Sequence, residues 1–253
     1  MNFTLDIIQI AAFLGAGICV GVASITCGIG EGYIAGVAAR GMMKQPASRD
    51  QLYRAMFIGQ AVTETGGIFS LVIGLLLLFG GFDIVEGGWF RFAALLSAGI
   101  AMGVGSLGPV AGAGYAGGQA CHAICRMPRQ SNTIMGYMLI GQALAQTSSI
   151  FALLVSLLLL YSTPLQASIP NLSAGSILIR SVAYIGAGLA IGIGTIGPGS
   201  GIGNVAGKAC RMVGKYPGEK SHIMRTMFLG AAVSQSTAIY ALVVSFLLIF
   251  SVK

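Results

Sequence analysis

Charged residues are scarce in this sequence, and acidic residues are the scarcest of them. Asp and Glu together number 7 in 253 residues, and charged residues of both signs make up only 8% of the chain. An average soluble domain has about 25% charged residues. Because 55% of the residues are hydrophobic, the composition excludes an ordinary soluble domain and predicts a protein that crosses the membrane several times.

Cysteine and histidine are also too few to indicate a disulfide framework or a metal site. The five cysteines lie in or beside apolar stretches, at Cys19, Cys27, Cys121, Cys125 and Cys210. None of their spacings is typical of disulfide-rich or zinc-binding domains. His122 lies beside two of these thiols, but thiols four residues apart near a helix end usually serve as small packing residues. The first apolar stretch contains Asp6, lacks a basic leader and is too long for a signal peptide, so we expect it to be a mature helix.

Six apolar stretches are long enough to cross a bilayer, which requires about 20 residues per helix. They are centred near residues 8–39, 55–80, 92–124, 134–162, 177–207 and 224–251. Eleven of the 14 Lys and Arg residues flank the connections after the first, third and fifth stretches: Arg40, Lys44, Arg49, Arg54, Arg126, Arg129, Lys208, Arg211, Lys215, Lys220 and Arg225. By the positive-inside rule, these loops are cytoplasmic and both termini lie outside. The net charge of +7 therefore reflects membrane orientation and gives no indication of nucleic-acid binding.

An internal repeat organises the whole chain. Pro46, Pro128 and Pro217 mark the three basic loops, and shifts of 82 and 171 residues superimpose the sequence around them. The segment "IFSLVIGLLLLF" then aligns with "IFALLVSLLLLY" and "IYALVVSFLLIF". We therefore expect an all-α membrane protein of three tandem helical hairpins, over residues 1–81, 82–163 and 164–253. All three hairpins share one orientation, unlike the inverted repeats of many transporters.

Glycines recur at matching positions in the first helix of every hairpin. Four of them align in all three repeats: Gly17, Gly21, Gly32 and Gly36; Gly99, Gly103, Gly114 and Gly118; Gly188, Gly192, Gly203 and Gly207. Small residues let helix backbones approach closely in a membrane. A dinucleotide-binding loop is excluded because no strand precedes these glycines. The pattern predicts an inner layer of closely packed helices.

These motifs together resemble the c subunit, or proteolipid, of rotary ATPases. The resemblance covers nearly the whole chain: a Gly-rich first helix, a short loop with proline ("KQP", "RMPRQ", "KYP") and a second helix that contains "QAVTET" and then "IF". The loops are more similar to the F-type than to the V-type version. The resemblance implies a two-layered ring of hairpins in the cell membrane, in contact with lipid, with the Gly-rich helices inside.

Partners are implied by the same resemblance. The ring would contain other c subunits, as identical or mixed copies, and would rotate against the stator a subunit. Its cytoplasmic loops would contact the central stalk. The sequence has no nucleotide-binding loop, so the chain is expected to be a non-catalytic subunit of the ATP synthase.

Glu64 is the residue that the apolar pattern explains least. A carboxyl inside a membrane costs several kcal/mol and is by default a functional hypothesis, and the resemblance assigns this position to the acid that carries the ion. Glu31 lies 15 residues before Pro46, and Glu64 lies 18 after it. At 1.5 Å per residue, both lie roughly 22–27 Å from the turn. We expect the two carboxyls to face each other.

The other two hairpins lack this pair of acids. Glu64 aligns with Gln146 and Gln235, whereas Glu31 aligns with Ala113 and Ile202. Only hairpin one can therefore carry charge at this depth. Hairpins two and three are expected to fill the ring, with the two glutamines as part of the wall beside the ion.

The residues at the expected ligand positions indicate which ion the site binds. Sodium-binding members of the family have a polar residue at the position of Glu31, a V-x-E-[ST] motif and a Tyr one turn later. Val62, Glu64 and Thr65 fit this motif, whereas Phe69 replaces the Tyr. We expect Na⁺ at Glu31 and Glu64, with one proton shared in a coupled titration, because two close carboxylates do not both ionise readily. A paired-carboxyl site that carries H⁺ remains the alternative.

The resemblance also implies that a neighbouring hairpin supplies a carbonyl and a hydroxyl to the ion, and that a Tyr hydroxyl fixes the carboxylate. Hairpin two offers the Leu144 carbonyl and Thr147. Hairpin three offers the fuller set, namely the Val233 carbonyl, Ser236 and Tyr240. We therefore expect the site to form between hairpin one and hairpin three of the next chain.

A self-contained six-helix transporter or channel is the competing class. Such a protein would bring intramembrane polar groups from several helices onto a central path, and it often contains broken helices. Here both intramembrane acids belong to one hairpin, and the repeated glycines predict hairpins that pack side by side. The sequence favours the ring.

Overall fold

The computed structural model describes residues 3–81, 88–166 and 174–250, and every regular element in these ranges is helical. Six helical segments within them are long and apolar enough to cross a membrane: Asp6–Lys44, Pro46–Phe79, Trp89–Arg126, Pro128–Tyr161, Gly175–Lys215 and Pro217–Phe250. The predicted all-α class and the six spans are confirmed.

Each hairpin consists of two antiparallel arms joined by a short 3₁₀ turn. Hairpin one contains α1 (Phe3–Lys44), η1 (Pro46–Ser48) and α2 (Arg49–Phe79). Hairpin two contains α3 (Gly88–Gly105), α4 (Leu107–Arg126), η2 (Pro128–Gln130) and α5 (Ser131–Gln166). Hairpin three contains α6 (Ala174–Gly194), α7 (Ile196–Lys215), η3 (Pro217–Glu219) and α8 (Lys220–Phe250).

Proline sets the position of all three turns. Gln45, Met127 and Tyr216 each precede a proline, and their ψ angles are 80°, 68° and 72°. A residue before proline is disfavoured in the helical region, because its own N–H and Cβ clash with the proline ring. The first arm of each hairpin therefore ends at this residue, and the chain reverses.

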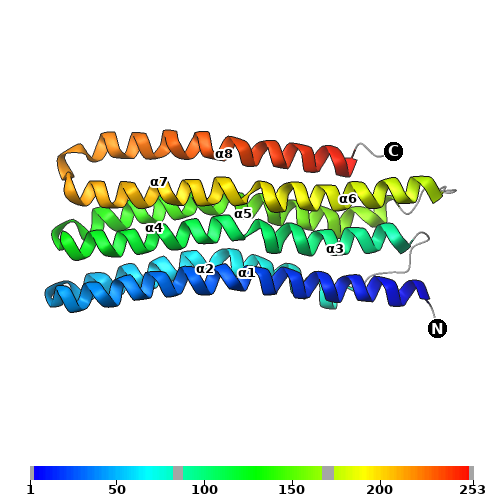
Figure 1. The fold of residues 1–253 in the computed structure, drawn as a ribbon, viewed down its shortest axis with the longest axis horizontal. Helices are drawn as coiled ribbons and strands as arrows, with labels where there is room; N and C mark the ends of the chain where they lie inside the picture. Colours follow the sequence, from blue (N-terminus) through cyan, green and yellow to red (C-terminus); the bar gives the residue numbers. More distant parts are fainter. Residues whose placement is uncertain (1–2, 82–87, 167–173, 251–253) are drawn as a thin grey trace.

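The three hairpins lie side by side, with hairpin two in the middle (Figure 1). The first arms form one layer, in which α1 packs against α3 and α4, α3 against α6, and α4 against α7. The second arms α2, α5 and α8 form the other layer. Helix α2 also packs against α4, and α5 packs against α7, so each of these outer arms contacts the inner arm of the following hairpin.

Glycines make the close approach within the inner layer possible. A methyl group in place of the Gly114 hydrogen would lie 2.6 Å from the Cα atom of Gly30, and one on Gly188 would lie 2.7 Å from the Ser97 carbonyl oxygen. Real Cβ atoms essentially never come so near to backbone atoms. The glycine pattern therefore reports direct backbone contact between neighbouring inner arms.

The inner arms of hairpins two and three are each interrupted by one residue, at Ser106 and Thr195, whereas α1 is continuous. The difference follows from Pro109 and Pro198, which align with Cys27 in hairpin one. Proline has no N–H for the carbonyl four residues earlier and clashes with it. The Gly105 carbonyl, which loses its helical donor in this way, has the Thr195 hydroxyl 3.0 Å away across the interface.

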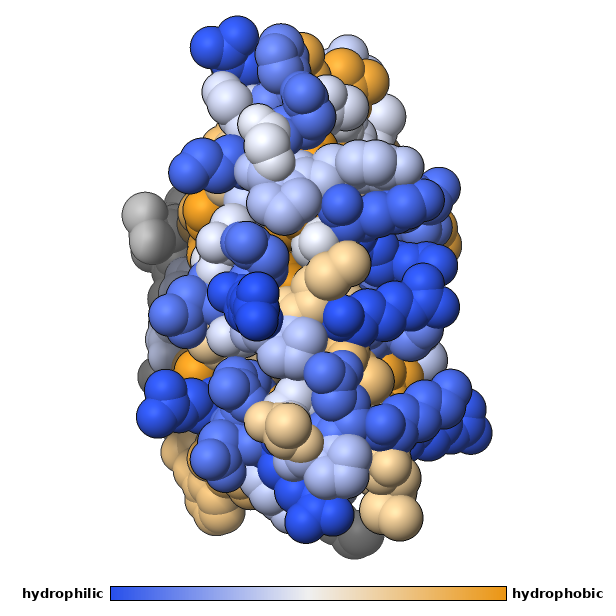
Figure 2. Space-filling model, turned by 90° about the vertical axis from the view of Figure 1, so that its left-hand side faces the viewer, coloured by the Kyte–Doolittle hydropathy of each residue, from blue (hydrophilic) through white to orange (hydrophobic). Residues whose placement is uncertain are grey.

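The three basic turns lie at one end of the molecule, and α1 begins and α8 ends at the opposite end (Figure 1). Viewed from the turns, this end is covered mostly by hydrophilic side chains (Figure 2). The long sides of the bundle are apolar, with exposed residues such as Ile29, Phe57 and Leu229. This distribution is the one that a bilayer requires of a multi-pass protein.

We predict that Thr195→Val lowers the free energy of unfolding in mixed detergent by about 0.6–1.7 kcal/mol, the range for hydrogen bonds between membrane helices. The loss should shrink in a Pro109→Ala background, where the new backbone N–H can bond to the Gly105 carbonyl. Ser106→Ala is the control, because the Ser106 hydroxyl bonds to Gly103 of its own turn. Equal losses for Thr195→Val in both backgrounds would contradict this role.

Candidate functional site

The structure brings Glu31 and Glu64 to the same level of hairpin one. Glu31 lies on α1 and is partly buried, Glu64 lies on α2 and is exposed, and the two carboxyls are near enough for their charges to interact. The Gln60 side chain, one turn before Glu64, donates a hydrogen bond of 3.2 Å to the Glu31 carbonyl. This bond holds the two helices in register at the depth of the acids.

Both acids lie away from hairpin two. Thr63 and Gly66, which flank Glu64 on α2, are buried against the second hairpin, and a Cβ atom on Gly66 would overlap the Val110 side chain. A rotation of 100° per residue turns Glu64 out of this contact. Gly67 instead faces the Cys27 thiol of α1. The acid pair therefore lies on the face of hairpin one that the rest of the described chain leaves uncovered.

The glutamines that replace Glu64 in the other hairpins both reach back to the preceding hairpin. The Gln146 amide donates a hydrogen bond of 3.2 Å to the Val62 carbonyl. The Gln235 amide oxygen accepts one of 3.0 Å from the Ser148 hydroxyl. These contacts define a rule of the repeat, in which this position faces the second arm of the hairpin before it.

The expected ligands of hairpin three are separated from the acids by hairpin two within one chain (Figure 1). Val233 and Tyr240 are 74% and 65% exposed on α8. The Ser236 hydroxyl donates a hydrogen bond of 2.7 Å to the Val233 carbonyl. These groups thus form an exposed set on the far side of the chain, and one copy alone cannot bring them to Glu64.

The remaining sequence-predicted residues lie beside Glu64 or between neighbouring hairpins, with Leu144 and Thr147 lining a cavity between hairpins two and three. Thr65 lies partly buried next to Glu64, and the Val62 carbonyl already accepts from Gln146. The Thr147 hydroxyl donates a bond of 2.6 Å to the Leu144 carbonyl, the same local bond that Ser236 makes. Val62 and Thr147 therefore belong to the wall between hairpins, away from the acid pair of the same chain.

Gln60, Gln142 and Thr63 have contacts at this level that the sequence alone did not predict. The Gln142 side chain is fully buried, and its amide nitrogen lies 2.9 Å from the Ala113 carbonyl, 3.0 Å from the Gly59 carbonyl and 3.3 Å from the Thr63 hydroxyl. The sequence did contain a signal for Gln60 and Gln142, namely a glutamine inside an apolar helix. Such a polar group needs a hydrogen-bond partner in the membrane.

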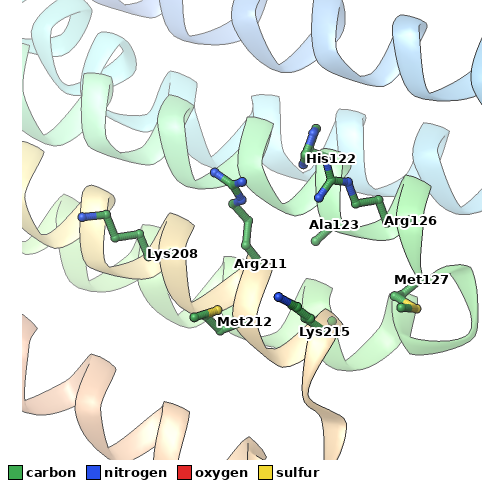
Figure 3. Close-up of a pocket in the computed structure, with 9 residues that line it drawn as sticks. His122, Ala123, Arg126, Met127, Lys208, Arg211, Met212 and Lys215 are labelled. Carbon is green, nitrogen blue, oxygen red and sulfur yellow. The ribbon is translucent and has the colours of Figure 1, made fainter.

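A second cluster of charge lies at the end that carries the turns. A cavity of about 530 Å³ between α4 and α7 is lined by His122, Arg126, Lys208, Arg211 and Lys215, with uncharged residues between them. Arg211 extends from α7 toward α4, which carries His122 and Arg126 (Figure 3). Within the described ranges, no acidic residue lines this cavity. The region is suited to contact with an anionic surface.

Among the described residues, no group of three or more His, Cys, Asp or Glu side chains is arranged to hold a metal ion. The groups at the level of Glu64 include the Glu31 carboxyl, the Gln60 amide and the Cys27 thiol, and carboxyl oxygens suit alkali cations and protons. Repeated hairpins, glycine-packed inner arms and intramembrane acids in one hairpin define a multi-pass membrane protein of the proteolipid class.

Comparison with known proteins makes the assignment specific. The family model that describes the C subunit of ATP synthase matches the chain three times, over residues 14–77, 96–159 and 185–248. These matches cover most of the chain and coincide with the three hairpins. The chain belongs to this ATP synthase family.

Two kinds of relative are found. The K subunit of the A-type ATP synthase of Methanocaldococcus jannaschii is 28% identical over 241 residues, which cover 95% of this chain and 96% of that protein. The ATP synthase c subunit of Natranaerobius thermophilus is 49% identical over 77 residues, or 30% of this chain and 88% of that protein. That of Mesomycoplasma hyopneumoniae (strain J) is 44% identical over 78 residues, or 31% and 76%. The chain is thus similar both to a relative of its own length and to relatives that correspond to one hairpin.

Proposed function

We propose that this chain is the rotor-ring subunit of a rotary ATP synthase or ATPase and that it carries one Na⁺ per chain on Glu31 and Glu64. The observation that carries this proposal is the acid pair, which occurs in one hairpin of three and lies on a face that the described residues leave open. A purely structural role would leave the cost of two intramembrane carboxyls unexplained.

Ion binding would neutralise the site for its passage past lipid. A bare carboxylate is costly in the hydrocarbon region, whereas a carboxylate with a bound cation or a proton is not. The ring can therefore rotate only with filled sites, and a site would exchange its ion where the stator opens a path to water. Each step of rotation then moves charge across the membrane.

Oxygen ligands support Na⁺ over H⁺. A proton requires only one carboxyl in apolar surroundings, whereas Na⁺ requires several oxygens. Glu31 and Glu64 supply carboxyl oxygens. Ser236 and the Val233 carbonyl would supply two more from a neighbouring copy, and Tyr240 would orient the carboxylate. With two carboxyls, one shared proton would remain beside the Na⁺.

Orientation and partners follow from the distribution of charge. We place the basic turns in the cytoplasm and both termini outside. The cluster around His122 and Arg211 would then meet the central stalk, while the outer arms face lipid and the stator a subunit. The interruptions at Ser106 and Thr195 do not favour a transporter path, since Thr195 bonds across to the Gly105 carbonyl and fills the break.

Dicyclohexylcarbodiimide, which reacts with protonated carboxyls in apolar surroundings, should label Glu64 selectively. Na⁺ should slow the labelling, and the protection should be stronger at higher pH, where protons compete less for the shared site. The measurement is the rate of labelling with and without Na⁺ between roughly pH 6 and 9. Equal rates under both conditions would rule out Na⁺ and leave the proton-carrying ring, and labelling centred on another residue would rule out the site.

Na⁺ affinity should fall in Ser236→Ala and in Tyr240→Phe, because each removes an oxygen that the neighbouring copy supplies to the site. Thr147→Ala is the matched control, since Thr147 occupies the position of Ser236 in hairpin two. The half-protecting Na⁺ concentration in the labelling reaction gives the affinity. If Thr147→Ala were the damaging change and the other two were silent, the site would lie within one chain.

A ring made only of this chain should work as an ATP-driven ion pump. With one ion for every three hairpins, few charges move per turn, and each supplies only about 2.3 kcal/mol per 100 mV. Few charges cannot readily drive ATP synthesis at an ordinary potential but can be pumped against a steep gradient. Reconstituted holoenzyme in liposomes tests this, and sustained ATP synthesis by such a ring at about 100–150 mV would contradict it.

A further inference from the structure

Hairpin one has a glycine face to which nothing in the described part of the chain is packed. Methyl groups at Gly17, Gly21, Gly32 and Gly36 would meet no described atom within 4 Å. The aligned glycines of the other hairpins all contact the preceding hairpin: Gly99, Gly103, Gly114 and Gly118 face α1, and Gly188, Gly192, Gly203 and Gly207 face α3 and α4. Hairpin one therefore presents a surface of the type that elsewhere receives a preceding hairpin.

The surface of each inner arm that contacts the following hairpin also carries a glycine at the same position of the repeat. Gly30 receives Gly114, and Gly112 receives Gly203, both in close contact between backbones. Gly201 of hairpin three aligns with Gly30 and Gly112. The residue that would contact Gly201 from a following hairpin aligns with Gly114 and Gly203, and in hairpin one that residue is Gly32. Glycine is thus present on both sides of a contact that one chain cannot make. A second copy of the chain supplies the matching surfaces in the right orientation.

Two positions that face each other across each contact between hairpins are either both polar or both apolar. Between hairpins one and two, the Gln142 amide lies 3.3 Å from the Thr63 hydroxyl. Between hairpins two and three, the same two positions are Ala231 and Ala145, and both lie in one apolar cluster with Ile202. A polar residue on one side occurs with a polar residue on the other, as buried groups in a membrane require.

Hairpins three and one carry the polar version of this pair. The position of Thr63 is Ser234 in hairpin three, and the position of Gln142 is Gln60 in hairpin one. Gln60 bonds to the Glu31 carbonyl as Gln142 bonds to the Ala113 carbonyl at the aligned position. The amide is therefore already oriented as Gln142 is. The second N–H of the Gln60 amide would bond to Ser234 of another copy, as the Gln142 amide contacts Thr63.

A hydroxyl and a carbonyl form a second matched pair. Thr195 reaches the Gly105 carbonyl that Pro109 leaves without a helical donor. In hairpin three, Pro198 leaves the Gly194 carbonyl in the same condition. The residue that would face it from a following hairpin is Ser24, which aligns with Thr195 and is exposed on α1. The Ser24 hydroxyl lies 2.7 Å from the Val20 carbonyl of its own helix, as the Thr195 hydroxyl lies 2.9 Å from the Ile191 carbonyl while it also reaches Gly105.

We propose that a second copy of this chain seats hairpin three on hairpin one, with Gln60 bonded to Ser234 and Ser24 bonded to the Gly194 carbonyl of that copy. This inference rests on the proposed ring and adds the residues that select the neighbour. The two pairs fix the register between copies and hold the Glu31 backbone level with the ligands on α8. Gln60 is thus a positioning residue at the boundary between chains.

The test is the dissociation of purified rings into chains in graded detergent, followed by native mass spectrometry. The wild-type ring should have a mass that is a whole multiple of 25.9 kDa. Gln60→Ala and Ser234→Ala should each raise the dissociation constant roughly threefold per boundary, the scale of one interhelical hydrogen bond. The double variant should dissociate no more readily than either single variant, because it recreates the natural pair Ala145 and Ala231.

Gln142→Ala and Thr63→Ala are the matched controls, since they remove the same pair inside one chain, where chains cannot separate. Dissociation of these controls should equal that of the wild type. Single variants that behave like the wild type, additive effects in the double variant, or a ring that contains a different proteolipid would each overturn the inference. Rings that still show Na⁺-protected labelling of Glu64 would leave the proposed function intact, whereas the absence of rings would overturn both.

Discussion

The direct backbone contact between neighbouring inner arms is the constraint on which the other features depend. Glycines at Gly30, Gly114, Gly112 and Gly203 let α1, α4 and α7 approach until their backbones touch. At that spacing two outer arms reach the inner arm of the following hairpin, α2 that of hairpin two and α5 that of hairpin three. Polar side chains on the outer arms can then bridge adjacent hairpins. A larger residue at these glycines would separate the hairpins and break every such bridge.

The second requirement is that buried polar groups be paired, and it bears on the position of Glu64 in hairpin one. Within the chain, the glutamines at the position of Glu64 each bond to the hairpin before them, through Val62 and Ser148. Glu64 occupies the same position in hairpin one, and the described residues include no hairpin that packs there. The proposed ion site would use the boundary where a partner is supplied by assembly, so loading of the ion and formation of the ring would depend on each other.

The fold was predictable from the sequence, because each hairpin is specified locally. Apolar length defines the spans, and a proline after each basic segment sets the turn. The interruptions at Ser106 and Thr195 have a local cause in Pro109 and Pro198, although they were not predicted. The bond from the Thr195 hydroxyl to the freed Gly105 carbonyl was not predictable, because its two partners lie in different hairpins. The same holds for the site: Glu31 and Glu64 were found from their charge, whereas the contacts of Gln60, Gln142 and Thr63 depend on which faces of the hairpins meet.

The number of Na⁺ ions bound per chain, measured in the assembled ring and in detergent-dispersed chains, tests most directly whether the ion site forms at the boundary between copies. We expect one Na⁺ per 25.9 kDa chain in the ring, because only hairpin one carries acids at the aligned positions of Glu31 and Glu64. We expect no saturable binding in dispersed chains, because hairpin three of the neighbour is then absent. Equal binding in dispersed chains, or more than one Na⁺ per chain in the ring, would contradict a site completed by the next copy.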